Sequence, residues 1–190
     1  MDLEEKVIKL EALAWLIAHV DGLTTDEAAS LDFLPGQVRA YSGLREGVME
    51  FEKTGDLDQA MKHVHNAPIF VTELHFGMPE HIQEVIDEVE AIAESETVID
   101  DFKTLVKIRA SEFDDEFDQK LFLGAIEDVV SADGVSEIEM HFFLEVSRVW
   151  GVTRRQANGW FNEYVLPVFE EAMIRFGQGL FSDDELSDEE

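Results

Sequence analysis

Residues 133–139 read Asp-Gly-Val-Ser-Glu-Ile-Glu, and residues 21–27 read Asp-Gly-Leu-Thr-Thr-Asp-Glu. Both stretches fit one pattern, D-G-x-[ST]-x-x-E. Each follows a run with the apolar periodicity of an amphipathic helix, at about 4–20 and 116–132, and each precedes a further helical run. The repeated pattern therefore predicts two helix hairpins with equivalent corners.

The residue types within each corner have a local physical explanation. Glycine can adopt the left-handed conformation that closes the first helix. The hydroxyl residue two positions later is a good N-cap for the second helix, and a glutamate three residues further on completes a capping box. These roles fall to Gly22, Thr24 and Glu27 in the first corner, and to Gly134, Ser136 and Glu139 in the second.

Helical periodicity continues outward from the two corners. Apolar residues recur at helical spacing over about 82–92, 97–111, 137–150 and 154–166. The run Ile69-Phe70-Val71 alone resembles a strand, and it is too short to show whether a strand forms there. We predict an all-α fold: a single multi-helix domain with two pseudo-symmetric helix hairpins.

Proline and glycine suggest where the helices end. Pro35-Gly36 is expected to end an early helix, and Thr54-Gly55-Asp56 to break the next one. Gly151 follows a helix that ends at Trp150, and Pro167 should stop or kink the last helix. We expect the folded domain to cover 1–181, followed by an acidic disordered tail at 182–190.

Charge limits the classes of partner. The chain has 190 residues with 43 acidic and 14 basic side chains, a formal net charge of −29. Such a surface repels nucleic acid and anionic lipid, and it attracts cations or basic proteins. No segment has the ~20 apolar residues of a membrane helix, no basic signal sequence begins the chain, and cysteine is absent, so we expect a cytoplasmic protein.

The aspartates of the two corners are the residues that capping leaves unexplained. Asp21 and Asp133 follow helix C-termini, where exposed carbonyls disfavour a negative charge by up to ~1 kcal/mol. Either a capping hydrogen bond or a bound cation could compensate. An ordinary EF-hand is excluded, because Met140 and Ala28 stand where its bidentate glutamate is required. A metal site would have to combine both corners, with Asp21, Glu27, Asp133 and Glu139 as oxygen ligands for Ca²⁺ or Mg²⁺.

The two corner segments, 14–24 and 123–136, resemble the paired "A-D-G-x-S-x-x-E" segments of the TerB-like tellurite-resistance family, which also occur in DjlA-type co-chaperones. The stretch Phe142–Val152 resembles that family's "I-A-x-x-L-G-L-S" segment. The resemblance covers about 4–34 and 80–155, with 35–78 as a helical insertion, and His19-Val20 departs from the family's small residues. It implies an all-helical fold, an acidic surface that binds Ca²⁺ or Mg²⁺, and a role in stress response.

Other groups of residues give weaker evidence of a functional site. The histidines His63, His65, His75 and His81 are close in sequence, but His63 and His65 point to different faces of one helix. The segment 150–163 resembles a homeodomain recognition helix, yet Glu163 stands at the base-reading position, and Thr153 with Gln156 reads as a capping box. No nucleophile elbow, phosphate loop or zinc-protease motif occurs, so we do not expect an enzyme.

The function that we expect from the sequence is that of a non-enzymatic, acidic helical domain that binds a hard divalent cation, as a stress-response scaffold or sensor. The alternative is a protein-interaction module without metal, whose acidic surface recruits a basic partner. A third interpretation is an acidic mimic of nucleic acid that captures a basic protein.

Overall fold

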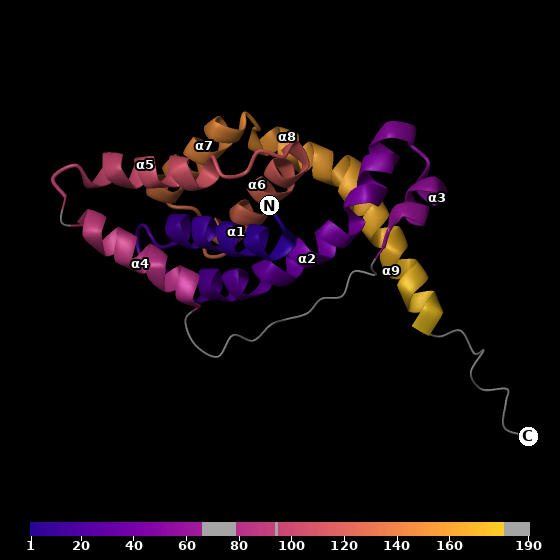
Figure 1. Cartoon of the computed structure of the whole chain (residues 1–190), viewed down its shortest axis with the longest axis horizontal. Coiled ribbons are helices and arrows are strands. Elements are labelled where there is room, and N and C mark those ends of the chain that lie inside the picture. Colours follow the sequence, from indigo (N-terminus) through magenta and orange to yellow (C-terminus); the bar gives the residue numbers. More distant parts are fainter. Residues whose placement is uncertain (66–78, 94, 181–190) are drawn as a thin grey trace, which may run out of the picture. The chain divides into compact units, whose positions relative to one another are not determined.

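The predicted all-α class is confirmed. The computed structural model describes residues 1–65, 79–93 and 95–180, and these residues form helices and turns without a strand (Figure 1). The predicted strand-like run, the 182–190 tail and His75 lie outside the described residues. The α-helices are α1 (Leu3–Ala18), α2 (Thr25–Thr54), α3 (Leu57–Ala60), α4 (Glu80–Ala93), α5 (Val98–Ala110), α6 (Glu116–Val130), α7 (Glu137–Trp150), α8 (Arg154–Trp160) and α9 (Leu166–Leu180).

The chain divides into two compact units. Unit 1 comprises Met1–Arg39 and Val71–Gly159, and unit 2 comprises Ala40–Phe70 and Trp160–Glu190. The predicted insertion at 35–78 thus contributes most of its length to unit 2. None of the described helices has a stretch of the length and low charge that crossing a bilayer requires.

Helix α1 is the centre of unit 1. Every residue from Leu10 to Ala18 is buried, so the second half of the helix is enclosed on all sides. It packs against α4, α5, α6 and α7. The enclosed stretch includes one charged side chain, Glu11, whose Oε2 lies 2.9 Å from Nε2 of His81 on α4. Burial of that carboxylate is therefore compensated by a specific partner.

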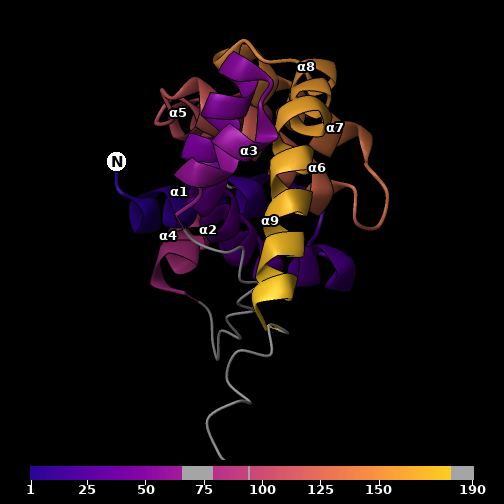
Figure 2. The ribbon, with the colours of Figure 1, turned by 90° about the vertical axis from the view of Figure 1, so that its right-hand side faces the viewer.

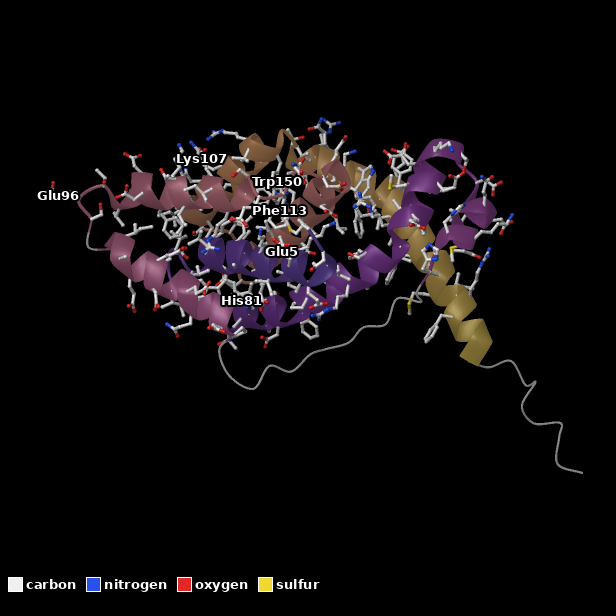
Figure 3. All side chains as sticks on the ribbon, in the orientation of Figure 1. Glu5, His81, Glu96, Lys107, Phe113 and Trp150 are labelled. Carbon is white, nitrogen blue, oxygen red and sulfur yellow. The ribbon has the colours of Figure 1, made fainter. Side chains whose placement is uncertain are left out.

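Helices α5 and α7 form a second layer of unit 1 (Figure 1). The rings of Phe102 and Phe142 contact each other between these helices, with centroids 4.6 Å apart and ring planes tilted by 51°. At the other end of α5 the ring of Trp150 meets Phe113 edge-on, and its Nε1 donates a 2.7 Å hydrogen bond to the carbonyl of Ala110 (Figure 3). The indole thus ties the end of α7 to the end of α5.

The prediction that Pro35-Gly36 ends a helix is wrong. Helix α2 continues through Pro35 to Thr54, where the predicted break at Gly55 does occur with a φ of +66°. Proline removes one backbone hydrogen bond from a helix interior. The buried side chains on either side of it, Leu31, Leu34 and Val38, keep one apolar face continuous and hold the helix together across the missing bond.

Pro167 splits the last helical segment, as predicted. Residues Phe161–Val165 form a π-helical turn between α8 and α9, and the N–H of Leu166 donates to the carbonyl of Phe161. Because Pro167 has no N–H, it cannot bond the carbonyl four residues before it, and a wider turn there accommodates the loss. The predicted capping box before α8 is also present, since Thr153 N donates to Gln156 Oε1 over 2.9 Å and Gln156 N to Thr153 Oγ1 over 3.3 Å.

Unit 2 is held together by α9 and the elements around it. Helix α3 packs beside α9 (Figure 2), and Arg175 of α9 reaches Asp58 of α3 over 2.7 Å. Tyr41 contacts the rings of Phe161 and Phe169. A Cβ atom at Gly47 would stand 2.7 Å from a methyl group of Val64, so close packing requires glycine there.

We predict that Leu13→Ala lowers the free energy of unfolding by about 2–5 kcal/mol, because it removes a fully buried side chain from the central helix. Ile8→Ala is the matched control, since Ile8 lies on the same helix and is 42% exposed. It should cost less than about 1 kcal/mol. Urea unfolding followed by circular dichroism measures both, and equal losses would contradict the central position of α1.

Candidate metal centre

The two Asp-Gly corners have the same backbone geometry. Gly22 and Gly134 have φ angles of +112° and +109°. In each corner the glycine N–H lies 3.3 Å from the carbonyl oxygen three residues earlier, that of His19 or Ser131. The prediction that these glycines take a conformation unfavourable for other residues is confirmed.

Both predicted capping boxes form. Ser136 N donates to Glu139 Oε2 over 2.7 Å, and Glu139 N donates back to Ser136 Oγ over 3.2 Å. In the first corner Thr24 N donates to Glu27 Oε2 over 2.8 Å, and Glu27 N donates to Thr24 Oγ1 over 3.3 Å. Each glutamate is thus held in one conformation at the start of its helix.

The capping glutamates are buried, although a glutamate in the first turn of a helix needs no burial to act as a cap. Glu27 is 1% exposed and Glu139 is 2% exposed. A side-chain interaction with Glu27 is one of the causes that raise the pKa of Glu139, so the carboxyl groups of α2 and α7 lie within interaction distance of each other. The packing of unit 1 therefore joins one carboxyl group from each corner into a pair, which we call the Glu27–Glu139 pair.

The corner aspartates are placed differently from the glutamates. Asp21 and Asp133 are both exposed to solvent. Asp21 is still near enough for its negative charge to act on Glu139. Of the four predicted ligands, the structure thus brings Glu27 and Glu139 into contact, places Asp21 within electrostatic reach, and leaves Asp133 at the surface of its corner.

The pKa of Glu139 is raised to about 7. Burial is the largest cause, and the side-chain interaction with Glu27 raises it further. Hydrogen bonds from the backbone and side chain of Ser136 act in the opposite direction, and the charge of Asp21 adds a smaller increase. Around neutral pH Glu139 therefore changes between its protonated and its charged form.

One oxygen of the pair lacks a donor. Glu27 Oε1 is buried and accepts no hydrogen bond from the residues that the structure describes. A buried carboxylate oxygen without a partner is costly. A proton on Glu139 satisfies it, and once that proton leaves, a cation is the other species that can do so.

Two carboxyl groups are only part of a ligand set for Ca²⁺ or Mg²⁺, which take six or more oxygens. Over residues 1–65, 79–93 and 95–180, no three His, Asp or Glu side chains converge in a geometry that could hold a metal. Among the histidines that are close in sequence, His81 pairs with Glu11 in unit 1 and His65 pairs with Glu46 in unit 2, while His75 lies outside the described residues. Asp21 is the further acid whose charge acts on the Glu27–Glu139 pair.

The sequence analysis assigned Glu27 and Glu139 to one predicted site that combines both corners. It did not predict that both glutamates are buried, because nothing in the spacing shows which face of α2 or α7 is covered. The repeated glutamate at the third helical position of both corners was the available signal. It marks corresponding positions in the two corners.

Other buried carboxylates in unit 1 have cationic partners and form no comparable site. Glu145 is 2% exposed, and its pKa is lowered by the hydrogen bond from Lys103 and the charges of Arg148 and Lys107. Asp118 is 5% exposed and lies 2.6 Å from the ammonium of Lys6. The Glu27–Glu139 pair differs because acids, rather than cations, are the charged groups that shift the pKa of Glu139.

Comparisons with known proteins add no assignment. No family model, no curated protein and no solved structure matches this chain.

We predict that the protein loses stability as pH rises through about 4.5 to 7, because Glu139 binds a proton more tightly in the folded than in the unfolded chain. The contribution of Glu139 to the free energy of unfolding is fully present below the pKa of this group in the unfolded chain. It is lost as pH rises above its pKa in the folded chain. Its size is about 3 kcal/mol at most. Glu139→Gln keeps a capping residue and a hydrogen-bond donor to Glu27, so it should remove most of this dependence and stabilise the protein at about pH 8.

Glu137→Gln is the control for this experiment, because Glu137 lies in the same helical turn and is exposed. It should leave the pH profile unchanged. Urea unfolding at several pH values measures the effect. An unchanged profile in Glu139→Gln would show that the Glu27–Glu139 pair carries no excess proton.

Proposed function

We propose that this chain binds a hard divalent cation, Ca²⁺ or Mg²⁺, at the Glu27–Glu139 pair. The observation that carries the proposal is the buried meeting of two carboxyl groups from equivalent corners, with Glu27 Oε1 lacking a hydrogen-bond donor. Carboxylate oxygens are the preferred ligands of both ions. A divalent cation replaces the proton on Glu139 and neutralises the charge that deprotonation leaves.

The remaining ligands come from the corners themselves. Asp21 and Asp133 are exposed, so their side chains can rotate without disrupting the core. Each follows the end of a helix, where carbonyl groups have no helical partner and can act as oxygen ligands. With water, these groups complete a coordination shell around the buried pair.

The proposed role is non-enzymatic. This proposal is supported by the acidic oxygens that the site offers and by the sequence, in which no nucleophile elbow, phosphate loop or zinc-protease motif occurs. A cation that joins α2 to α7 changes the stability of unit 1, which is the behaviour of a sensor or scaffold. The stress-response setting rests on the resemblance to TerB-like proteins alone.

We predict measurable Ca²⁺ or Mg²⁺ binding by isothermal titration calorimetry at about pH 8, with roughly tenfold weaker affinity for each pH unit below about 7, where a proton competes for Glu139. Glu27→Gln with Glu139→Gln should abolish binding. Asp21→Asn with Asp133→Asn should weaken it about tenfold or more, since two anionic ligands are lost.

The matched control is Asp26→Asn with Glu137→Gln, which removes the same number of charges from exposed positions of the same two helical turns. It should keep the wild-type affinity. Equal losses in the control and the site variants would show that the cation responds to net charge rather than to a site. The absence of any heat with both ions at about pH 8 would overturn the proposal.

A further inference from the structure

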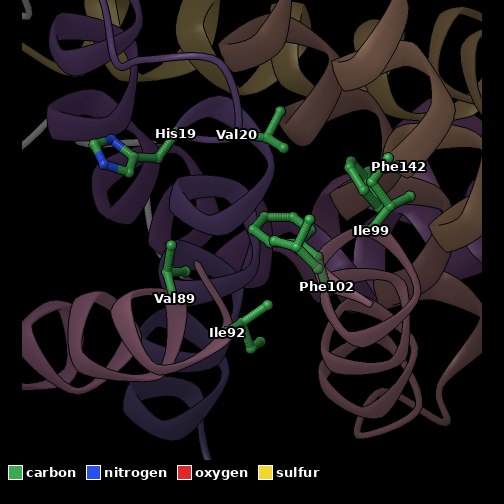
Figure 4. Close-up of a pocket in the computed structure, with 8 residues that line it drawn as sticks. His19, Val20, Val89, Ile92, Ile99, Phe102 and Phe142 are labelled. Carbon is green, nitrogen blue, oxygen red and sulfur yellow. The ribbon is translucent and has the colours of Figure 1, made fainter. Parts of the chain in front are cut away.

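An apolar pocket lies beside the first corner in unit 1. Its cavity volume is about 160 Å³, and it opens to solvent. Figure 4 shows Phe102 in the middle of the view, with His19 and Val89 on one side and Phe142 on the other. The lining residues are His19, Val20, Val89, Ile92, Val98, Ile99, Phe102 and Phe142.

The pocket has a rigid floor and an exposed apolar mouth. Phe102 and Phe142 are 5% and 1% exposed, and their rings contact each other at a tilted angle. Ile99 and Val98 are 57% and 41% exposed, although they belong to the same lining. The ring of His19 stacks on Trp15 with centroids 4.3 Å apart, which holds that wall in place. Apolar surface therefore remains in contact with water around a preformed cavity, and covering it is favourable.

The surroundings of the pocket are strongly acidic. No lysine or arginine occurs between Lys62 and Lys103, the span that contains both α4 and the start of α5. Lys103 itself is engaged with Glu145 at 2.9 Å. The exposed acids adjacent in sequence to the lining residues, or in the connection between α4 and α5, are Asp21, Glu90, Glu96 and Asp100; Figure 3 marks Glu96 at that connection.

The volume of the pocket and the negative charge of its rim together indicate which kind of ligand fits it. A cavity of about 150 Å³ holds a group as large as benzene, so this one has room for a single leucine- or phenylalanine-sized side chain. A second copy of the chain carries the same net charge of −29, and like charges oppose its approach. A neutral small molecule would gain nothing from the acidic rim. A cationic segment with one apolar anchor satisfies both features.

We propose that this pocket is a docking site for a basic peptide segment of another protein, which inserts one large apolar side chain beside Phe102 and sets its lysines or arginines against the acidic rim. The anchor supplies most of the affinity because it is buried in a preformed cavity. The rim charges supply attraction at a distance and select against acidic partners. This inference rests on observations separate from those that support the cation proposal.

The test uses the full chain in EDTA, so that failure of cation binding cannot affect it. The probe is a fluorescein-labelled peptide of lysine and serine with one central phenylalanine, and binding is followed by fluorescence anisotropy. Replacing that phenylalanine by alanine should weaken binding about tenfold or more, the effect of losing about 1.5–3 kcal/mol of apolar burial. Raising NaCl from about 0.05 M to about 0.5 M should weaken it further.

Two protein variants separate the pocket from the general charge. Ile99→Lys places a cation at the mouth of the pocket, and it should weaken binding of the phenylalanine peptide about tenfold. Ile108→Lys makes the same chemical change on the same helix, at a position that is 55% exposed and outside the pocket. It should stay within about twofold of wild type. Both positions are exposed, so neither variant should unfold the protein.

Three results would overturn the inference. One is equal binding of the phenylalanine and alanine peptides, which would leave only non-specific charge attraction. Another is equal weakening by Ile99→Lys and Ile108→Lys. The third is a concentration-dependent dimer in analytical ultracentrifugation that Ile99→Lys dissociates, which would assign the pocket to a second copy of the chain.

Discussion

Enclosure of α1 is the constraint on which the rest of unit 1 depends. A helix buried on all sides needs neighbours on all sides, and α4, α5, α6 and α7 supply them. The enclosed stretch runs to Ala18, so the corner that follows it begins at the inner end of the helix. The corner's next helix, α2, therefore starts close to the core, and the glutamate in its first turn is buried as a consequence.

Burial makes the two capping glutamates, Glu27 and Glu139, costly to ionise. A carboxylate in the first turn of a helix is stabilised by the helix dipole and by the capping bonds. These contributions are opposed by the loss of water around the Glu27–Glu139 pair, and for Glu139 the loss of water prevails, since its pKa rises to about 7 despite two hydrogen bonds from Ser136. Local structure holds the carboxyl groups in place, and tertiary packing makes them costly to ionise. A proton on Glu139 resolves that conflict, and the proposed cation would take its place.

The helices and corners could be predicted from the sequence because local forces determine them. Periodicity located α4 to α7 within two or three residues, and the capping pattern predicted both positive-φ glycines and both capping boxes. Pro35 was misjudged because a local helix breaker was outweighed by continuous burial of one face of α2. The contact between Glu27 and Glu139, and the pocket around Phe102, could not be predicted because both arise where separate helices meet. A single sequence shows that two corners are equivalent, but not that they are adjacent.

The corner and the pocket share structural elements, which has a thermodynamic consequence. His19 and Val20 line the pocket and immediately precede Asp21, while Phe142 lies one helical turn after Glu139. A cation drawn between α2 and α7 acts on the first turn of α7, and an apolar anchor in the pocket acts on the next turn of the same helix. If each ligand favours a particular position of α7, their binding free energies are coupled, and the coupling is equal in both directions. Charge makes a second contribution to the coupling, because a cation at the Glu27–Glu139 pair lowers the negative potential that attracts a basic segment to the acidic rim. If both ligands favour the same position of α7, packing makes each ligand strengthen the binding of the other. The charge of the cation acts in the opposite direction, because it weakens the attraction of the basic segment. The larger of these two contributions decides the sign of the coupling free energy.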